Sequence, residues 1–249
     1  MTVPHLDELT QAYFNAQTQR TLGTLERIAS RAPPAAGRLI PGPDDLPISD
    51  GRRIEATVMF LDICKFTQRP SETDEEQHVL LQVLALFFSE MIRIVEDHGG
   101  VVEKNTGDGL MAYFADNAAA KSEKRAVAAA LTMFAAASHL INPILEKSGI
   151  PVLNFRICMD RGFITVAKIG AARRFSGLVA VGTTANMASK MLSIAEANTI
   201  LIGQKMLGGL PADWLVFTVP HPIDTGWYYR ATGVAYRYWT YTGRWNIPT

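Results

Sequence analysis

The spacing of apolar residues predicts a strand, a helix and a hairpin in the first half of the chain. Residues 56–63 (ATVMFLDI) form a continuous apolar run that is typical of a buried strand. The runs VVEK and GLMAYF flank residues 105–108 (NTGD), which predicts a hairpin with a tight turn. Between strand and hairpin, apolar residues at helical spacing predict a long helix that ends at Gly99-Gly100; they are Leu80, Leu84, Phe87, Phe88, Met91 and Val95.

An alanine-rich helix over about residues 117–147 and a strand within residues 152–159 follow the hairpin. The resulting order is β-α-β-β-α-β, which predicts an α+β fold with a ferredoxin-like core. The later residues predict additional elements: strands at 163–170 and 178–181, a helix at 185–197, and a closing hairpin in the Tyr- and Trp-rich residues 228–242.

The first 45 residues differ from the rest. Residues 6 to 28 follow helical spacing, and the segment APPAAGRLIPGPDDLP after them contains five prolines, as a linker does. We therefore divide the chain into an N-terminal helix with a proline-rich linker, residues 1–45, and one principal domain, residues 46–249. The apolar face of the helix is expected to pack on the core or on a partner chain, and a sensor role is the alternative.

Composition narrows the kinds of partner. With 249 residues and 48% apolar composition, the chain can bury one good core. Its 24 basic residues balance 24 acidic ones, so we expect neither a nucleic-acid footprint nor binding to an anionic membrane surface. Any polyanionic ligand must then be held by a local site.

Cysteine usage and apolar runs indicate a cytoplasmic protein. Cys64 and Cys158 lie far apart without a CxxC pair, which argues against a disulfide framework or a structural zinc site. The most apolar run, residues 126–142, contains His139 and is followed by Pro143, so we expect a buried helix instead of a membrane span. The first residues lack the basic and apolar regions of a signal peptide.

Two carboxylates are the first candidates for chemistry. Asp62 follows buried apolar residues at the end of the first predicted strand, and Asp108 lies in the hairpin turn. In a βαββαβ sheet the first strand lies beside this hairpin, so the two acids are expected to converge. Such oxygen ligands suit Mg²⁺ or Mn²⁺, and two ions would clamp a triphosphate during in-line displacement. The alternative is that Asp62 caps a loop and Asp108 is an ordinary turn residue.

Three segments together resemble class III nucleotidyl cyclases. Residues 60–67 (FLDICKFT) resemble the signature F-x-D-I-x-x-F-(S/T), and residues 104–108 (KNTGD) resemble K-x-x-G-D. Residues 182–191 (GTTANMASKM) are similar to G-D-x-x-N-x-A-S-R-M. The motifs occur in the order of the family, across residues 55 to 245, and imply that residues 46–249 form a nucleotidyl cyclase catalytic domain.

The resemblance implies a role for each matching residue. Asp62, Asp108 and the Ile63 carbonyl would hold two Mg²⁺ or Mn²⁺ ions. Asn186 and Lys190, on one helical face, would orient the ribose and stabilise charge on the α-phosphate, and they would reach the metals of the other subunit. The active form is thus expected to be a homodimer with its sites at the subunit interface. Backbone amides of the loop after the first strand would cradle the triphosphate: Cys64, Lys65, Phe66 and Thr67. The Lys65 side chain adds a cation at this loop, for a phosphate contact or, alternatively, for solvent.

Two positions depart from the family pattern. Lys190 stands where the family has arginine, so the planar two-donor contact is lost, and Arg230 in the tail is a candidate for compensation. In purine-specific members, a lysine at the position of Lys104 and an acidic or small polar residue at that of Val179 read the base. No acid occurs from Ala171 to Gly182, so an exocyclic amino group would lack its acceptor.

With its N-terminal helix and these altered positions, the chain resembles the bacterial pyrimidine cyclases of the Pycsar anti-phage systems. Those enzymes make cyclic UMP or cyclic CMP. UTP is favoured over CTP, because Lys104 can donate to a uracil carbonyl whereas cytosine presents an amino donor. Adenylate cyclase activity is one alternative. A fold that binds nucleotide or dimerises without chemistry is another, and the argument against it is that two unpaired acids are kept together. Arg161, Arg173 and Arg174 are further candidates for contact with the base or the phosphates, although we expect each of them to be solvated at the surface.

Overall fold

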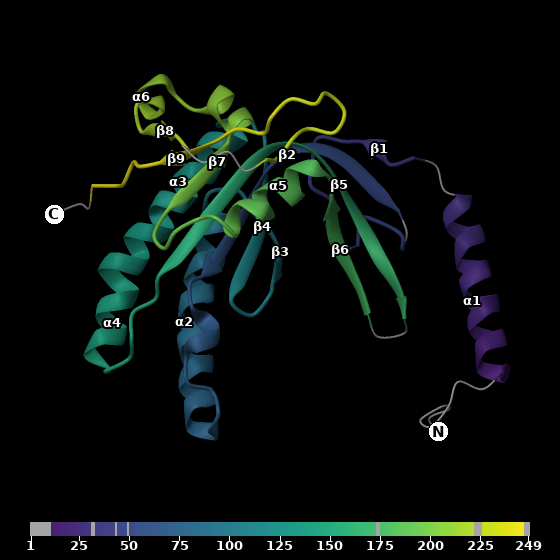
Figure 1. Cartoon of the computed structure of the whole chain (residues 1–249), viewed down its shortest axis with the longest axis horizontal. Coiled ribbons are helices and arrows are strands. Elements are labelled where there is room, and N and C mark those ends of the chain that lie inside the picture. The colour runs from purple at the N-terminus through teal and green to yellow at the C-terminus, as the bar shows by residue number, and fades with distance from the viewer. Residues whose placement is uncertain are drawn as a thin grey trace.

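The sheet is organised around one long strand (Figure 1). The computed structural model describes residues 11–30, 33–42, 44–48, 50–172, 175–221 and 226–246. In it, β2 (Gly51–Ile63) pairs antiparallel with β4 (Gly109–Ala115) on one side and with β5 (Phe155–Ala172) on the other. With β3 (Val101–Asn105) at the edge, the strand order is β3-β4-β2-β5. Helices α2 (Asp74–Asp97) and α3 (Ser122–Ala136) form the connections, which confirms the predicted βαββαβ core and the α+β fold.

Further strands and short helices extend this core. The sheet continues from β5 through β7 (Ile200–Gly203) and β9 (Tyr238–Tyr241) to β8 (Thr218–Pro220). β1 (Ala35–Ala36) pairs with β2, and β6 (Phe175–Val181) pairs with β5. The remaining helical segments are α1 (Gln11–Ala29), η1 (Phe66–Gln68), η2 (Ala137–Ile141), α4 (Asn142–Lys147), α5 (Thr183–Leu192), η3 (Gln204–Gly209) and α6 (Ala212–Leu215).

The two faces of the sheet have different partners because side chains alternate along β2. Met59, Leu61 and Ile63 belong to the main core, which α2 and α3 cover with the buried side chains of Phe87, Met91, Met133 and Phe134. Ile54, Ala56 and Val58 belong to a second cluster with Ala185 and Ala188 of α5. By the same alternation, Asp62 lies on the α5 face of the sheet.

Local chemistry explains where the helices begin and break. Helix α2 starts at a capping box, in which Thr73 accepts from the Glu76 amide and Glu76 accepts from the Thr73 amide. The alanine-rich helix begins at Ser122 instead of near residue 117, because the Asn117 side chain holds a turn by accepting from two amides. A π-helical turn, η2, precedes Pro143, which lacks the amide that a continuous α-helix would use.

Three predicted elements differ in extent. The strands expected at 152–159 and 163–170 are one strand, β5, which pairs with β2 from Phe155–Ile63 to Ala167–Gly51. Residues 160–162 of β5 lie within this ladder and do not interrupt it. Helix α5 ends at Leu192, not at residue 197. The tail forms only a bridge between Tyr228 and Ala235, and β9 pairs with β7 and β8.

The N-terminal helix lies to one side of the sheet, away from α2, α3 and α4 (Figure 1). Its described apolar residues are exposed by 48–59%: Phe14, Leu22, Leu25 and Ile28. The expectation that this face packs on the core of its own chain is therefore wrong for the described part of the helix. The division at residues 45 and 46 stays a prediction, and residues 6–10 of the expected helix lie outside the described residues.

Two helices have the length and apolar composition of a membrane span. They are α2 and the continuous helical segment Ser122–Lys147. Both helices cover the sheet. In the most apolar window of each, 33% of α2 and 50% of Ser122–Lys147 is buried. This burial is the arrangement expected for core helices.

Candidate active site

The sheet register places Asp62 and Asp108 side by side. Asp62 stands opposite Gly109 in the β2–β4 ladder, and the Ile63 amide donates to the Asp108 carbonyl at 2.9 Å. A side chain at residue 109 would approach the Leu61 carbonyl and the Asp62 carboxylate, so glycine keeps this corner open. The predicted proximity of the two acids is present, and metal binding by them stays a prediction.

Asp62 has a partner that the sequence analysis missed. Arg156 on β5 lies directly opposite it, and its Nε and Nη2 both donate to Asp62 Oδ2, at 2.9 and 2.7 Å. The third nitrogen, Nη1, donates to the Ala195 carbonyl at 3.1 Å, which fixes the guanidinium. The premise that both acids are unpaired is therefore wrong for Asp62. The only signal in the sequence was an arginine inside the apolar run VLNFRICM.

The donor set fits a hard divalent cation. It consists of the Asp62 and Asp108 carboxylates and the neighbouring Ile63 carbonyl, all oxygen donors of the kind that Mg²⁺ and Mn²⁺ prefer. One Asp62 oxygen is held by Arg156, whereas Asp108 contacts no basic side chain among the described residues. The corner therefore offers anionic oxygens beside a fixed positive charge.

The loop after β2 reverses sharply at Lys65, whose φ of 56° and ψ of 28° are left-handed. The Cys64 amide donates to the Asn154 carbonyl at 2.8 Å, so it is not free for a phosphate. Phe66 packs against the main core, while Lys65 and Thr67 are exposed. The expected cradle is thus reduced to the amides of residues 65–67, which donate to no backbone carbonyl among the described residues.

The predicted base-reading residues lie on two strands. Lys104 is on β3 with its side chain 47% exposed, and its Nζ lies 3.2 Å from Glu103 Oε1. Val179 is on β6, half-buried and opposite Ala167 of β5. The position of Val179 therefore offers no acid to a base, and the other residues of β6 include none either.

Asn186 and Lys190 are both exposed on α5, as their spacing predicts. The Lys190 ammonium lies 5.8 Å from the centre of the Trp227 ring. In the part of the chain that is described, neither residue contacts Asp62 or Asp108. Arg230 is exposed in the tail, between the bridged residues Tyr228 and Ala235. Within a single chain, the residues expected to form one site are thus two groups without a direct contact between them: the carboxylate pair, and Asn186 with Lys190.

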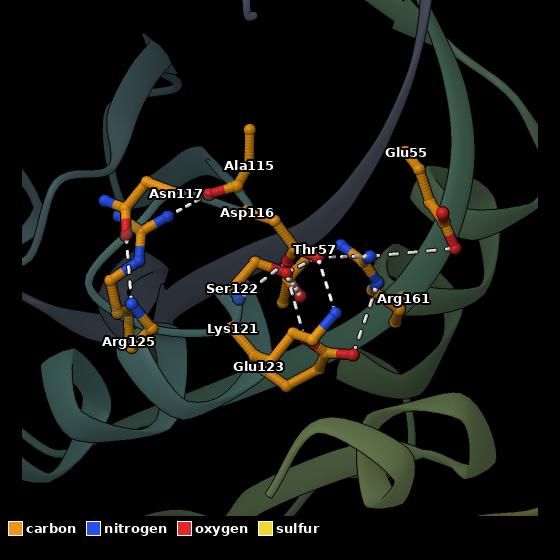
Figure 2. Close-up of polar contacts among 11 residues, drawn as sticks. Glu55, Thr57, Ala115, Asp116, Asn117, Lys121, Ser122, Glu123, Arg125 and Arg161 are labelled. Atoms are coloured by element: carbon orange, nitrogen blue, oxygen red, sulfur yellow. Dashed lines mark hydrogen bonds and ion pairs between the residues drawn. The ribbon is translucent and has the colours of Figure 1, made fainter. Parts of the chain in front are cut away.

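The expectation that Arg161 is solvated is wrong. Arg161 is buried, with its guanidinium among Ser122, Asp116 and Glu123 at the start of α3 (Figure 2). Its Nη1 donates to Ser122 Oγ at 2.7 Å, and its Nε lies 3.3 Å from Glu123 Oε1. Arg173 and Arg174 lie outside the described residues.

A buried carboxyl on β5 was also missed. Asp160 is 2% exposed, accepts from the Arg161 amide at 2.9 Å and is hydrogen-bonded to Tyr236. Burial raises the pKa of Asp160 to about 7, against the smaller lowering effects of these hydrogen bonds and of Lys205. The polar triplet Asp160-Arg161-Gly162 looked like a break between strands, which concealed the burial of both charged residues.

The chain is similar to several known proteins. Residues 50–217 match the family model of the adenylate and guanylate cyclase catalytic domain. A protein of Burkholderia cepacia named uridylate cyclase is 27% identical over 165 residues, which are 64% of this chain and 69% of that protein. An uncharacterised protein of Mycobacterium tuberculosis is 32% identical over 150 residues, and the match covers 59% of this chain but only 26% of that relative.

Solved cyclase structures are similar in fold. The adenylyl cyclase CyaB from P. aeruginosa superposes with a TM-score of 0.62 and 25% identity, over 77% of this chain and 95% of that one. The guanylyl cyclase Cya2 gives 0.63 and 21%, over 78% and 94%. A class III adenylyl cyclase-like ATP-binding protein from Pseudomonas aeruginosa gives 0.64 and 21%, over 85% and 50%.

Proposed function

Because the chain belongs to the adenylate and guanylate cyclase catalytic domain family, we propose that it converts a pyrimidine nucleoside triphosphate into the 3′,5′-cyclic monophosphate and pyrophosphate. UTP is the preferred substrate and CTP the second choice. The observation that carries this proposal is Val179, which leaves the base-reading position without a hydrogen-bond acceptor. The similarity to a protein named uridylate cyclase supports it.

Asp62, Asp108 and the Ile63 carbonyl hold two Mg²⁺ or Mn²⁺ ions in this proposal. When bound, such ions make the ribose 3′-hydroxyl a better nucleophile and neutralise the leaving pyrophosphate. The amides of residues 65–67 and the Lys65 side chain bind the phosphates. Asn186 orients the ribose, and Lys190 stabilises the charge that develops on the α-phosphate, as a point charge in place of the usual arginine.

The separation of the two groups of residues supports a shared site in a homodimer. Asp62 and Asp108 of one subunit would face Asn186, Lys190 and Lys104 of the other across the α5 face of the sheet. Two such sites form when the same surface is used by both subunits. The product would act as a second messenger in the cytoplasm, with anti-phage defence as its biological role.

The test is an activity screen with four nucleoside triphosphates. Purified protein is incubated with UTP, CTP, ATP or GTP in the presence of Mn²⁺, and the cyclic product is identified by mass spectrometry. We expect cyclic UMP to dominate, and the Asp108→Ala variant to make none. Preference for ATP by an order of magnitude would replace the proposal with adenylate cyclase activity.

A second candidate is a domain that binds nucleotide without turning it over. Two observations favour it: the similarity to an adenylyl cyclase-like ATP-binding protein, and the engagement of Asp62 by Arg156. Isothermal titration with each triphosphate, next to the activity screen, separates the candidates. Micromolar binding with no cyclic product from any of the four would favour this second function.

A further inference from the structure

Glu103 has an unusual position on the edge strand. The ladder between β3 and β4 shifts register between Val102 and Lys104, because Val102 pairs with Ala112 and Lys104 pairs with Met111. Such a bulge inserts one unpaired residue and lets two successive side chains turn toward the same side of a strand. Glu103 is the inserted residue, directly before the lysine that is expected to read the base.

The Glu103 carboxylate is buried although its neighbour is not. The Glu103 side chain is 1% exposed, compared with 47% for Lys104, and the Lys104 ammonium lies 3.2 Å from Oε1. The backbone amide of Ala180 on β6 also faces the carboxylate. Neither oxygen has a hydrogen bond of normal geometry, so this acid is not satisfied as an ordinary structural group would be.

The charges around Glu103 link this carboxylate to one cation, Lys104. Burial raises the pKa of the Glu103 carboxyl, while Lys104 and the Ala180 amide lower it. Lys104 is the one cation that contacts the carboxylate among the described residues. A buried carboxylate without a second function is costly, which favours a role in holding that cation.

We propose that Glu103 is a positioning residue for Lys104: it anchors the ammonium at the base subsite from the same strand, while its own oxygens stay hidden from the base. This inference rests on the proposed function and deepens it. In purine-specific relatives an acidic or small polar residue at the position of Val179 helps the lysine to read the base. Here that position is apolar, and the carboxylate that contacts the lysine comes from the lysine's own strand.

The consequence is a base subsite that donates but does not accept. A uracil carbonyl accepts from Lys104, so UTP finds its partner. The exocyclic amino groups of cytosine and adenine find no acceptor, because the Glu103 oxygens are covered and Val179 is apolar. The structure thus assigns the preference for uracil to the pair Glu103–Lys104 together with Val179.

The experiment uses Glu103→Gln, which keeps the shape and removes the charge. We expect KM for UTP to rise by roughly tenfold with little change in kcat, and the ratio of kcat/KM for UTP over CTP to fall, since Lys104 loses its anchor. The exposed Glu96→Gln on α2 is the matched control and should change neither quantity. Thermal unfolding of each variant checks that the fold is kept.

A double-mutant cycle separates positioning from a merely structural role. In a Lys104→Met background, Glu103→Gln should leave the UTP to CTP ratio unchanged, because the residue through which it acts is gone. Adding Val179→Asp to Glu103→Gln should restore the counter-charge from β6 and move the preference toward CTP and ATP. The proposal is overturned if Glu103→Gln keeps the wild-type ratio, or if it shifts the ratio equally with and without Lys104.

Failure of the proposed function would be seen separately. If the wild-type protein turns over none of the four triphosphates, the cyclase proposal fails, and the same variants are then compared by isothermal titration with UTP and CTP in the presence of Mn²⁺. Loss of the UTP preference in binding on Glu103→Gln still supports the role of Glu103. An unchanged binding preference overturns it.

Discussion

Arg156 binds Asp62 across two neighbouring strands, because its Nε and Nη2 both donate hydrogen bonds to the same carboxylate oxygen, at 2.9 and 2.7 Å. The side chains are only 28% and 22% exposed, so solvent screens this pair weakly. A fixed positive charge therefore lies beside the expected metal ligands before any cation arrives. It holds the carboxylate in place, and it also repels a divalent ion.

The magnitudes decide which of these two effects is larger. Two unit charges about 5 Å apart interact by roughly 3 kcal/mol at an effective dielectric constant of about 20, and a divalent ion doubles this. Fixing one side chain saves only about 1 kcal/mol of conformational entropy. Removing the Arg156 charge by Arg156→Gln should therefore tighten Mn²⁺ binding in the absence of nucleotide by about tenfold or more.

Isothermal titration with Mn²⁺, or electron paramagnetic resonance of the free ion, measures this affinity directly. Arg156→Lys is the control, because it keeps the charge and loses only the two-donor contact. It should bind Mn²⁺ nearly as the wild type does. Weaker Mn²⁺ binding by Arg156→Gln would mean that the orientation of Asp62 matters more than the repulsion.

The second prediction concerns the shared active site. Asp62→Ala removes a ligand from one group of residues and Asn186→Ala removes a contact from the other, so each variant alone should be inactive. Mixed subunits form heterodimers in which one of the two sites has both wild-type halves. After equilibration at equal amounts, roughly a quarter of the wild-type activity should return.

A mixture of Asp62→Ala with Asp108→Ala provides the control. Both changes affect the same half, so every site in every dimer stays defective and activity should not return. Native mass spectrometry confirms that heterodimers have formed in both mixtures. No recovery in the test mixture would place Asp62 and Asn186 in one chain's own site. Recovery in the control would place Asp62 and Asp108 in different halves of a site.

The sequence was sufficient for the core because its signals are local. The apolar spacing of α2 and the two glycines after it define a helix and its end, and the turn at residues 105–108 defines a hairpin. Once the βαββαβ order is known, the topology alone brings Asp62 next to Asp108. This proximity needed no knowledge of side-chain packing.

The partners of the charged residues depend on register, which the sequence does not determine. Arg156 meets Asp62 only because β2 and β5 pair along the whole of β2, from Gly51 to Ile63. A shift by one residue would place the two side chains on opposite faces of the sheet. The burial of Arg161 and the bulge at Glu103 likewise follow from how the elements meet, and an arginine or a glutamate in a strand is by itself expected to be exposed.

The third prediction concerns the buried network around Arg161 (Figure 2). Its guanidinium donates to Ser122 and lies near Glu123, which is itself buried. Arg161→Met leaves Glu123 buried without its cation, and such losses cost about 3–5 kcal/mol of unfolding free energy. Urea unfolding followed by circular dichroism measures the change.

Glu55 supplies the control for this network. Its carboxylate lies 3.7 Å from the same guanidinium, but the Glu55 side chain is 51% exposed. Glu55→Gln should therefore change the unfolding free energy by about 0.5 kcal/mol or less, the usual value for an exposed pair. The double variant Arg161→Met with Glu123→Leu should recover part of the stability lost by Arg161→Met alone. A loss from Arg161→Met no larger than that from Glu55→Gln would contradict a stabilising network.

The fourth prediction concerns pH and Asp160. Burial raises the pKa of this carboxyl from 3.8 to about 7, so the folded protein keeps the proton over a range in which the unfolded chain has lost it. Below pH 3.8 both states are protonated and the folded state is not penalised. As pH rises from there toward 7, the unfolded state gains stability by ionising, and the contribution of Asp160 to folding stability decreases. Above pH 7 the penalty is constant.

Asp160→Asn tests this directly, because an amide resembles the protonated carboxyl and keeps an oxygen that accepts from the Arg161 amide. The Tyr236 hydroxyl remains neutral at these pH values, since burial and the nearby Asp160 raise its pKa. The variant should match the wild type in Tm near pH 4 and exceed it by at least about 2–4 °C at pH 8, the shift that 1 kcal/mol gives in a chain of this size. A Tm difference that is the same at both pH values would show that Asp160 ionises in the folded state as easily as in the unfolded chain, and would remove it as the source of the pH dependence.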